Sequence, residues 1–239
     1  MVAENLIEVR NRIAAVCGRS GRRPQDVLLV AVSKTFGWEI VREAVDAGQQ
    51  DFGENYVQEL TEKRQAAIDH KVRWHYIGHL QSNKAKHIVE FVHLIHSVDN
   101  EQIARELDRR AEKANRSIDI LLEVHTTDET TKFGVSPGKT IDLAKAISRL
   151  KRVKIQGLMT MGPFSEDPND SRPSFRQLAD SKRRIEAEGI ENVSMSQLSM
   201  GMTHDFEVAI EEGATIVRIG TAIFGRRTTA LKEQMKGVL

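Results

Sequence analysis

One lysine of the chain stands where an amine nucleophile could be activated. Lys34 follows an apolar run, VLLVAV, and Ser33, rather than lying in a charged surface stretch. Partial burial at the end of a strand disfavours the ammonium form, which lowers the pKa of a lysine and leaves an amine able to attack a carbonyl. The position is therefore compatible with Schiff-base chemistry. The alternative is that Lys34 simply ends a strand and points into water.

Two glycine-containing segments near the C-terminus have the residue types of an anion site. In LSMGM, Ser199 offers a hydroxyl, and Met200 and Gly201 offer backbone N–H groups. In RIGTAIFG, Gly220 and Thr221 open a predicted helix, whose first N–H groups and dipole favour an anion. Together these residues predict a phosphate cup. The alternative is that the glycines only make tight turns from strand to helix.

Arg218 and Asn55 are two further candidates for ligand binding. Arg218 lies two residues before Gly220, so both point to the same side of their predicted strand. If Ile219 faces the surrounding helices, that side is the interior of the barrel predicted below. A buried arginine needs a partner, which could be the nitrogen of a heterocycle or a carboxylate in a structural ion pair. Asn55, in FGENY, could hydrogen-bond a ligand near Lys34 or could cap the helix that follows it.

No metal site is predicted. His75 and His79 are four residues apart, a ligand spacing that works on a helix, but the segment WHYIGH reads as extended. Cys17 is the only cysteine, so an internal disulfide and a cysteine-rich zinc site are excluded.

The candidate residues fall at the ends of predicted strands in a repeating pattern. Short β-branched runs alternate with longer segments whose apolar residues recur every three or four positions. The predicted strands are 27–33, 50–53, 74–78, 94–98, 118–125, 153–160, 194–200 and 216–219. The predicted helices are 38–47, 56–67, 83–90, 101–113, 139–149, 174–188, 206–212 and 222–236. Eight βα units predict an α/β protein with a closed (β/α)8 TIM barrel, whose chemistry lies at the C-terminal ends of the strands.

Two segments fall outside the eight repeats. Residues 1–20 predict an extra N-terminal helix that flanks the barrel, with an apolar stripe from Leu6 to Val16 and an end at Gly18. Residues 162–173, GPFSEDPNDSRP, predict a loop after the sixth strand and a candidate mobile lid. No Pro/Gly/Ser linker interrupts the chain, so residues 1–239 are expected to form a single domain.

The composition excludes several classes of partner. The chain has 239 residues, 40% of them hydrophobic, and a formal net charge of +1, so no overall field favours nucleic acid or an anionic membrane. Its apolar runs are far shorter than the ~20 residues of a membrane-spanning helix. The start, MVAENLIEVR, lacks the apolar run of a signal peptide. We expect a cytoplasmic protein without nucleic-acid or membrane partners.

Five stretches of the sequence together resemble one known family. They are AVSKT at 31–35, FGENYVQE at 52–59, WHYIGHLQSNK at 74–84, LSMGMTHDFEVAI at 198–210 and VRIGTAIFG at 217–225. In this order and spacing, the chain is similar to the pyridoxal phosphate homeostasis proteins, and the resemblance spans nearly its whole length.

The resemblance implies a barrel like the N-terminal domain of alanine racemase, with pyridoxal 5′-phosphate (PLP) bound at the mouth. Lys34 matches the lysine that forms the internal aldimine, Asn55 the asparagine beside the cofactor, and Arg218 the arginine facing the pyridine nitrogen. The family's phosphate-binding positions correspond to Ser199, Met200, Gly220 and Thr221. Thr203 stands where the family often has serine, which keeps the hydroxyl.

The family also implies a role in vitamin B6 homeostasis without a known enzymatic reaction. An arginine beside the pyridine nitrogen discourages its protonation, which weakens the cofactor as an electron sink. The leading hypothesis is a monomeric, non-catalytic carrier that buffers PLP or delivers it to apo PLP-dependent enzymes. The alternatives are a small racemase-like PLP enzyme, an aldolase using Lys34 on a sugar phosphate, and an interaction protein for an apo PLP enzyme.

Overall fold

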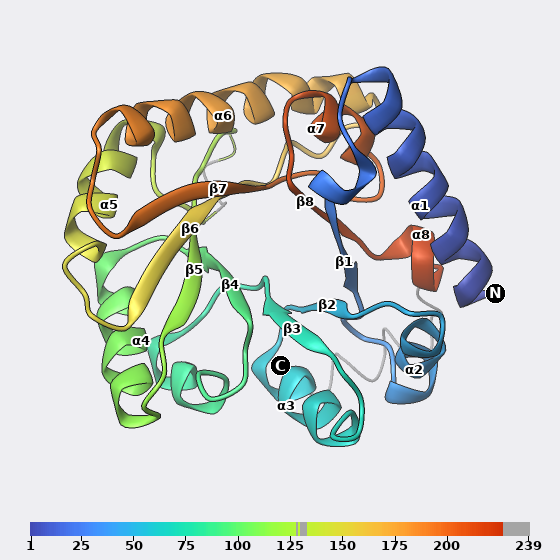
Figure 1. The fold of residues 1–239 in the computed structure, drawn as a ribbon, viewed down its shortest axis with the longest axis horizontal. Coiled ribbons are helices and arrows are strands. Elements are labelled where there is room, and N and C mark those ends of the chain that lie inside the picture. Colours follow the sequence, from blue (N-terminus) through green and yellow to red (C-terminus); the bar gives the residue numbers. More distant parts are fainter. Residues whose placement is uncertain (128, 130–132, 227–239) are drawn as a thin grey trace.

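The predicted barrel is confirmed by a computed structural model, which describes residues 1–127, 129 and 133–226 (Figure 1). Eight parallel strands pair in chain order, and β1 pairs with β8 to close the sheet. Their bounds are β1 Leu28–Val32, β2 Asp51–Glu54, β3 Arg73–Tyr76, β4 Leu94–Val98, β5 Ile118–Glu123, β6 Val153–Met159, β7 Val193–Ser199 and β8 Ile216–Ile219.

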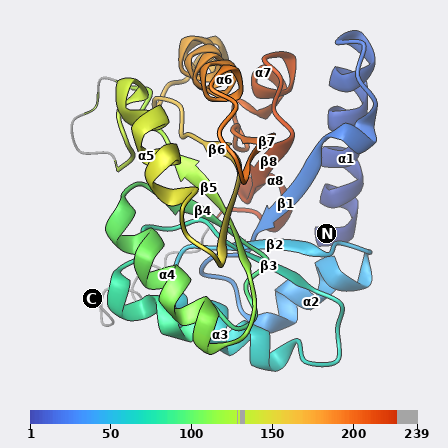
Figure 2. The same ribbon diagram turned by 60° about the vertical axis from the view of Figure 1, so that its left-hand side comes forward.

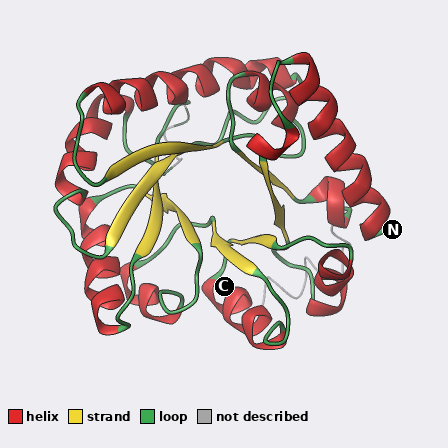
Figure 3. Ribbon diagram, viewed as in Figure 1, coloured by secondary structure: helices red, strands yellow, loops and turns green. Residues whose placement is uncertain are grey.

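Helices surround the strands as an outer ring (Figure 3). They are α1 Val2–Arg19, α2 Trp38–Asp46, α3 Val57–Ala66, α4 Glu101–Lys113, α5 Thr140–Ile147, α6 Arg172–Ala187, α7 Phe206–Glu211 and α8 Thr221–Phe224. Four short 3-10 helices join them, namely η1 Pro24–Asp26, η2 Ser82–His87, η3 Pro137–Lys139 and η4 Pro168–Ser171. Among the described residues, no helix is long and apolar enough to traverse a bilayer.

Two of the predicted helices differ from the structure. Where a helix was predicted at 83–90, the chain forms the 3-10 helix η2, whose hydrogen bonds span three residues, as from the Lys84 amide to the Gln81 carbonyl at 2.9 Å. The predicted helix at 222–236 corresponds to α8, which ends at Phe224 because Gly225 takes a φ of +85°. Residues 227–236 of that prediction lie outside the described residues.

The extra N-terminal helix flanks the barrel as predicted. In Figures 1 and 2, α1 stands beside β1 and α8, at the seam where the first and last strands meet. Asn5 Nδ2 donates a hydrogen bond to the Ile223 carbonyl at 2.8 Å. The helix continues through Gly18 to Arg19, and the chain turns only at Gly21, which has a φ of +66°. The predicted end at Gly18 is therefore one residue too early.

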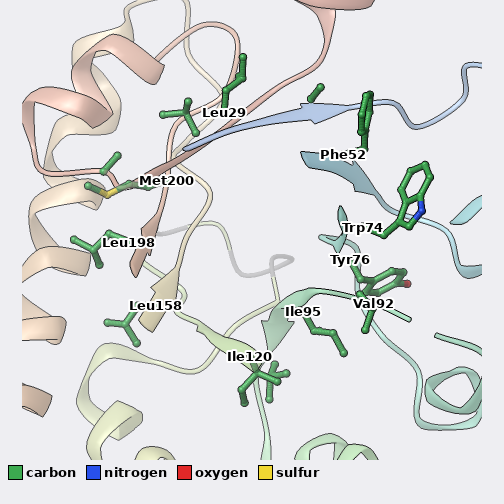
Figure 4. Close-up of a cluster of buried hydrophobic side chains, with 14 of the residues drawn as sticks. Leu29, Phe52, Trp74, Tyr76, Val92, Ile95, Ile120, Leu158, Leu198 and Met200 are labelled. Carbon is green, nitrogen blue, oxygen red and sulfur yellow. The ribbon is translucent and has the colours of Figure 1, made fainter. Parts of the chain in front are cut away.

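The apolar core has two parts because side chains alternate along each strand. The larger part lies between the sheet and the helices and includes Phe52, Trp74, Ile95 and Leu158 (Figure 4). A smaller cluster lies inside the barrel and consists of Val30, Leu94, Leu121, Met159 and Ile216. Polar side chains also lie inside the barrel, among them His75, His96, Ser199 and Arg218.

The loop predicted at 162–173 contains η4 and leads into α6. Its end is fixed, because Ser171 Oγ donates to Asp205 Oδ2 at 2.7 Å. Asp167 caps η4 by accepting a hydrogen bond from the Asn169 amide at 2.9 Å. The segment is thus irregular as expected but anchored at its C-terminal end, and its role as a lid stays a prediction.

Candidate functional site at the barrel mouth

The predicted site residues gather at one end of the barrel, because parallel strands all end on the same side. Lys34 follows β1, Asn55 follows β2, Gly201 follows β7, and Gly220 follows β8. Ser199 is the last residue of β7, and Thr221 opens α8. Lys34 and Asn55 are partly buried.

The turn that carries Lys34 is held from both sides. Ser33 Oγ donates to Glu54 Oε1 at 2.6 Å, and the Ser33 carbonyl accepts from Lys63 Nζ at 2.7 Å. The Thr35 amide donates to Glu59 Oε2 at 2.7 Å. Thr35 has a φ of +72°, a conformation that costs a β-branched residue energy and persists only where its surroundings impose it. These contacts supply that constraint.

A buried ion pair lies beneath this turn. Lys63 Nζ contacts Glu54 Oε1 at 2.6 Å and Glu59 Oε2 at 3.3 Å. Glu54 is fully buried, and this burial raises the pKa of its carboxyl group to about 7 despite the nearby lysine. Sequence reasoning missed Glu54 and Lys63. The available signal was a glutamate at the end of the short strand in FGEN.

Asn55 does not cap the next helix. The N-cap of α3 is Tyr56, without a side-chain cap hydrogen bond, so the capping alternative is wrong. Within the described part of the chain, the buried Asn55 Oδ1 accepts no hydrogen bond. Gly78 lets the Asn55 backbone approach, because a Cβ there would lie 2.1 Å from the Asn55 carbonyl oxygen. A buried acceptor without a donor is what a ligand hydroxyl or N–H would satisfy.

The loop after β7 is shaped for close approach. Gly201 has a φ of +89°, and a Cβ there would lie 2.5 Å from the Ala209 Cβ. The Met202 amide donates to Asp205 Oδ1 at 2.7 Å, which fixes the loop. No hydrogen bond within the described residues engages the Gly201 amide. The Met200 amide, in contrast, donates to the Ile216 carbonyl at 3.1 Å, so the sheet already uses this predicted anion donor.

The loop after β8 presents the start of a helix. Within the described residues, the Thr221 amide has no hydrogen-bond acceptor, whereas the Ile223 and Phe224 amides donate to the Gly220 carbonyl at 2.9 Å. The Ala222 amide reaches Thr203 Oγ1 at 3.5 Å, so Thr203 lies beside this turn. Gly220 approaches β1 closely, and a Cβ there would lie 3.1 Å from the Val32 carbonyl oxygen. Together with Gly201, these groups have the arrangement of an anion cup.

Arg218 faces the barrel interior, as the two-residue period predicts. Its Nη1 donates to Ser199 Oγ at 2.6 Å and its Nη2 to the Thr160 carbonyl at 2.9 Å. Burial lowers the pKa of the guanidinium to about 10. Among the described residues, Arg218 forms no ion pair with a carboxylate, so the structural ion pair left open by the sequence is not found there. The Ser199 hydroxyl thus lies inside the barrel, next to Arg218.

Two buried histidines continue inward from Ser199. His96 Nδ1 lies 2.9 Å from Ser199 Oγ, and His96 Nε2 lies 3.0 Å from His75 Nδ1. His75 Nε2 in turn lies 3.0 Å from Asp51 Oδ1. Sequence reasoning noted His75 only as a weak metal candidate. No three metal-ligating side chains cluster among the described residues, and His79 is exposed and stacks on Phe133 instead.

A second buried carboxyl group lies at the mouth. Glu123 ends β5 and lines a small pocket with His125, Phe133 and Met161. Burial, followed by the nearby Asp99 carboxylate, raises the pKa of Glu123 to about 7. The mouth therefore combines Lys34, a buried arginine, an amide oxygen with no hydrogen-bond partner among the described residues, and two buried glutamates whose pKa is raised to about 7.

This geometry agrees with the proteins that the chain resembles. The family model for the alanine racemase N-terminal domain matches residues 5–228. The pyridoxal phosphate homeostasis protein of Aquifex aeolicus is 46% identical over 224 residues, which cover 94% of this chain and 97% of that protein.

Solved structures give the same result. PipY of Synechococcus elongatus with PLP bound superposes with a TM-score of 0.82 at 34% identity, covering 94% of this chain and 100% of that one. Alanine racemase of Clostridium difficile gives a TM-score of 0.76 at 12% identity and shares the fold over 57% of its own length. By sequence and by fold, the chain belongs to the alanine racemase N-terminal domain family and, within it, to the pyridoxal phosphate homeostasis proteins.

Proposed function

We propose that this protein binds PLP at the barrel mouth as a Schiff base on Lys34 and takes part in PLP homeostasis without catalytic turnover. The relative with PLP bound, PipY, supports the choice of ligand. When bound, PLP supplies an aldehyde that condenses with an amine, forming a carbon–nitrogen double bond and releasing water.

The residues present at the mouth fit this cofactor. The observation that carries the proposal is Asn55 Oδ1, a buried acceptor without a donor in the described residues. Asn55 follows β2, the strand paired with the β1 strand that precedes Lys34. The phenolic hydroxyl of PLP is a donor of the kind this oxygen needs. On the other side of β1, after β7 and β8, the amides of Gly201 and Thr221 offer an anion site for the phosphate.

Each residue would have a separate task. Lys34 makes the covalent link, while Gly201, Gly220 and Thr221 hold the phosphate when the link opens. Arg218 keeps a positive charge inside the barrel, where it discourages protonation of a neighbouring ring nitrogen and so weakens carbanion chemistry. A protein that binds a reactive aldehyde reversibly in this way can buffer it and release it to apo PLP-dependent enzymes.

The covalent link is tested by absorption spectroscopy of the purified protein with added PLP, before and after borohydride. We expect a visible band, and peptide mass spectrometry should locate the reduced pyridoxyl group on Lys34. Lys34→Ala should lose the adduct completely but retain reversible, phosphate-dependent binding. Lys86→Ala, at an exposed position of η2, is the matched control and should behave as wild type. Absence of any adduct on wild type would sink the proposal.

The absence of turnover is tested separately. We expect amino acids incubated with the loaded protein to exchange their α-hydrogen with D2O no faster than with free PLP. Exchange at catalytic rates would favour a racemase-like enzyme and leave the binding proposal intact. Trapping with a ketose or aldose phosphate, instead of PLP, would favour an aldolase.

A further inference from the structure

We propose that Asp51, His75 and His96 are positioning residues that hold Arg218 through a chain of hydrogen bonds all directed the same way. We call Asp51, His75, His96, Ser199 and Arg218 the histidine chain. This inference rests on the proposed function at one point, the position of Arg218 facing the bound PLP.

The histidine chain crosses the barrel interior. It begins at Arg218 on β8, passes through Ser199 on β7 and His96 on β4, and reaches His75 on β3 and Asp51 on β2. Each consecutive contact measures between 2.6 and 3.0 Å. At the far end, Arg73 Nε donates to Asp51 Oδ1 at 2.7 Å and fixes the carboxylate.

The chemistry of its two ends determines the direction. Arg218 can only donate, so Ser199 Oγ accepts from it and has one proton left to give. His96 Nδ1 is the group within reach, so it accepts this proton and His96 carries its own proton on Nε2. At the other end an ionised Asp51 only accepts, so His75 donates to it from Nε2 and accepts from His96 on Nδ1.

Burial makes this arrangement selective. Ser199, His75 and His96 have no exposed surface, so water cannot replace a missing hydrogen bond. Burial is the largest cause that lowers the pKa of His96 well below its ordinary value, consistent with a neutral ring. A neutral His96 with its proton on Nε2 donates to His75 Nδ1, so the hydrogen-bond geometry gives the two rings the same tautomer.

The histidine chain orients the Arg218 guanidinium without bringing a carboxylate into contact with it. This guanidinium donates to a hydroxyl and a carbonyl, while the carboxylate at the far end of the chain, Asp51, is paired with Arg73. The chain orients the arginine and does not conduct protons, since a proton moving toward Asp51 would have to leave the guanidinium.

The tautomers are measured by nitrogen-15 NMR of histidine-labelled protein without PLP. We expect His75 and His96 to show protonated Nε2 and unprotonated Nδ1, with slowly exchanging ring protons. His93, which packs against the His75 ring but lies outside the chain, is the internal control and should exchange quickly. A doubly protonated ring or an Nδ1 proton on either chain histidine would overturn the inference.

The link to Arg218 is tested by substitution. His96→Phe should speed exchange of the Arg218 guanidinium protons and weaken PLP binding about tenfold, whereas His93→Phe should change binding less than twofold. His96→Gln keeps one acceptor and one donor, so it should restore most of the slow exchange of the Arg218 guanidinium protons. The same variant provides the test if His96→Phe fails to fold. Unchanged Arg218 exchange in both His96 variants would refute the chain, whereas failure of wild type to bind PLP would refute only the proposed function.

Discussion

Two buried polar networks flank the mouth of this barrel, and they work by different means. The first, which we call the Glu54 cluster, comprises Ser33, Glu54, Glu59 and Lys63 and fixes the turn that carries Lys34. The second is the histidine chain, which fixes Arg218. The Glu54 cluster uses an ion pair in contact, whereas the histidine chain separates its two charges by three neutral groups.

The two networks treat their cations differently: Lys63 is in contact with a carboxylate, whereas Arg218, within the described part of the chain, is not. Beside Lys34, a carboxylate neutralises Lys63, and the lysine that is needed for chemistry is held by its backbone neighbours. Arg218, in contrast, has no carboxylate in hydrogen-bond contact among the described residues, and Asp205 and Glu123 act on its charge from farther away. Both networks consist of the chain's own side chains and backbone groups.

Breaking the Glu54 cluster should give the largest effect. Glu54→Ala leaves the Lys63 ammonium buried without its closest partner, which we expect to lower the free energy of unfolding by about 3–5 kcal/mol. The measurement is urea denaturation. Glu101→Ala, which removes an exposed partner of Arg105, is the control and should cost less than about 1 kcal/mol. Equal losses in the two variants would mean that the ion pair does not hold the turn.

Breaking the histidine chain at its junction should cost less. Ser199→Ala leaves His96 Nδ1 and one Arg218 N–H without their partner, and we expect a loss of about 1–3 kcal/mol in the free energy of unfolding. Ser196→Ala, at an exposed position of the same strand, should stay within about 0.5 kcal/mol. If Ser199→Ala leaves the free energy of unfolding unchanged, the hydroxyl contributes no net stability.

The pH dependence of stability should separate the two networks further. The pKa of Glu54 and that of Glu123 are both raised to about 7, so between about pH 4.5 and 7 the folded state binds more protons than the unfolded state. Stability from these groups is therefore full below that window and falls as pH rises through it, by at most about 1.4 kcal/mol per pH unit for each group.

Asp51 acts with the opposite sign. Burial alone would raise its pKa, but hydrogen bonds from Arg73 and His75 prevail and lower it to about 2. Its contribution is present above about pH 4 and is lost as pH falls toward 2. Denaturation across pH should give a maximum between the two windows. Glu123→Gln should reduce the fall of stability between about pH 4.5 and 7. Glu112→Gln, at an exposed position, is the control and should leave that fall unchanged. An unchanged fall in Glu123→Gln would contradict this account.

Much of the site could be predicted because it depends on single strands. Lys34, Gly201 and Gly220 follow apolar runs, and in a parallel barrel the end of each run lies at the mouth. The inward direction of Arg218 follows from the two-residue period alone. These predictions need no knowledge of which residues lie opposite each other.

The rest depends on register between strands, which the sequence does not state. Three strands supply His75, His96 and Asp51. Only the register of these strands brings His75 Nδ1 within 3.0 Å of His96 Nε2. The Met200 amide was predicted as an anion donor, but pairing of β7 with β8 directs it to the Ile216 carbonyl. Asn55 could be separated from a helix cap only once the start of α3 was known.

The pairing of β1 with β8 also has a consequence for how the chain folds. Leu28 pairs with Ile216 and Ala31 with Ile219, so the first strand to be synthesised finds its second neighbour only in the last. Until β8 has left the ribosome, β1 keeps an open edge, the kind of surface through which incomplete sheets aggregate. Closure of the cylinder is a late, non-local event. The two loops that form the proposed phosphate cup belong to the last strands made, so the Lys34 turn is synthesised long before the cup is complete.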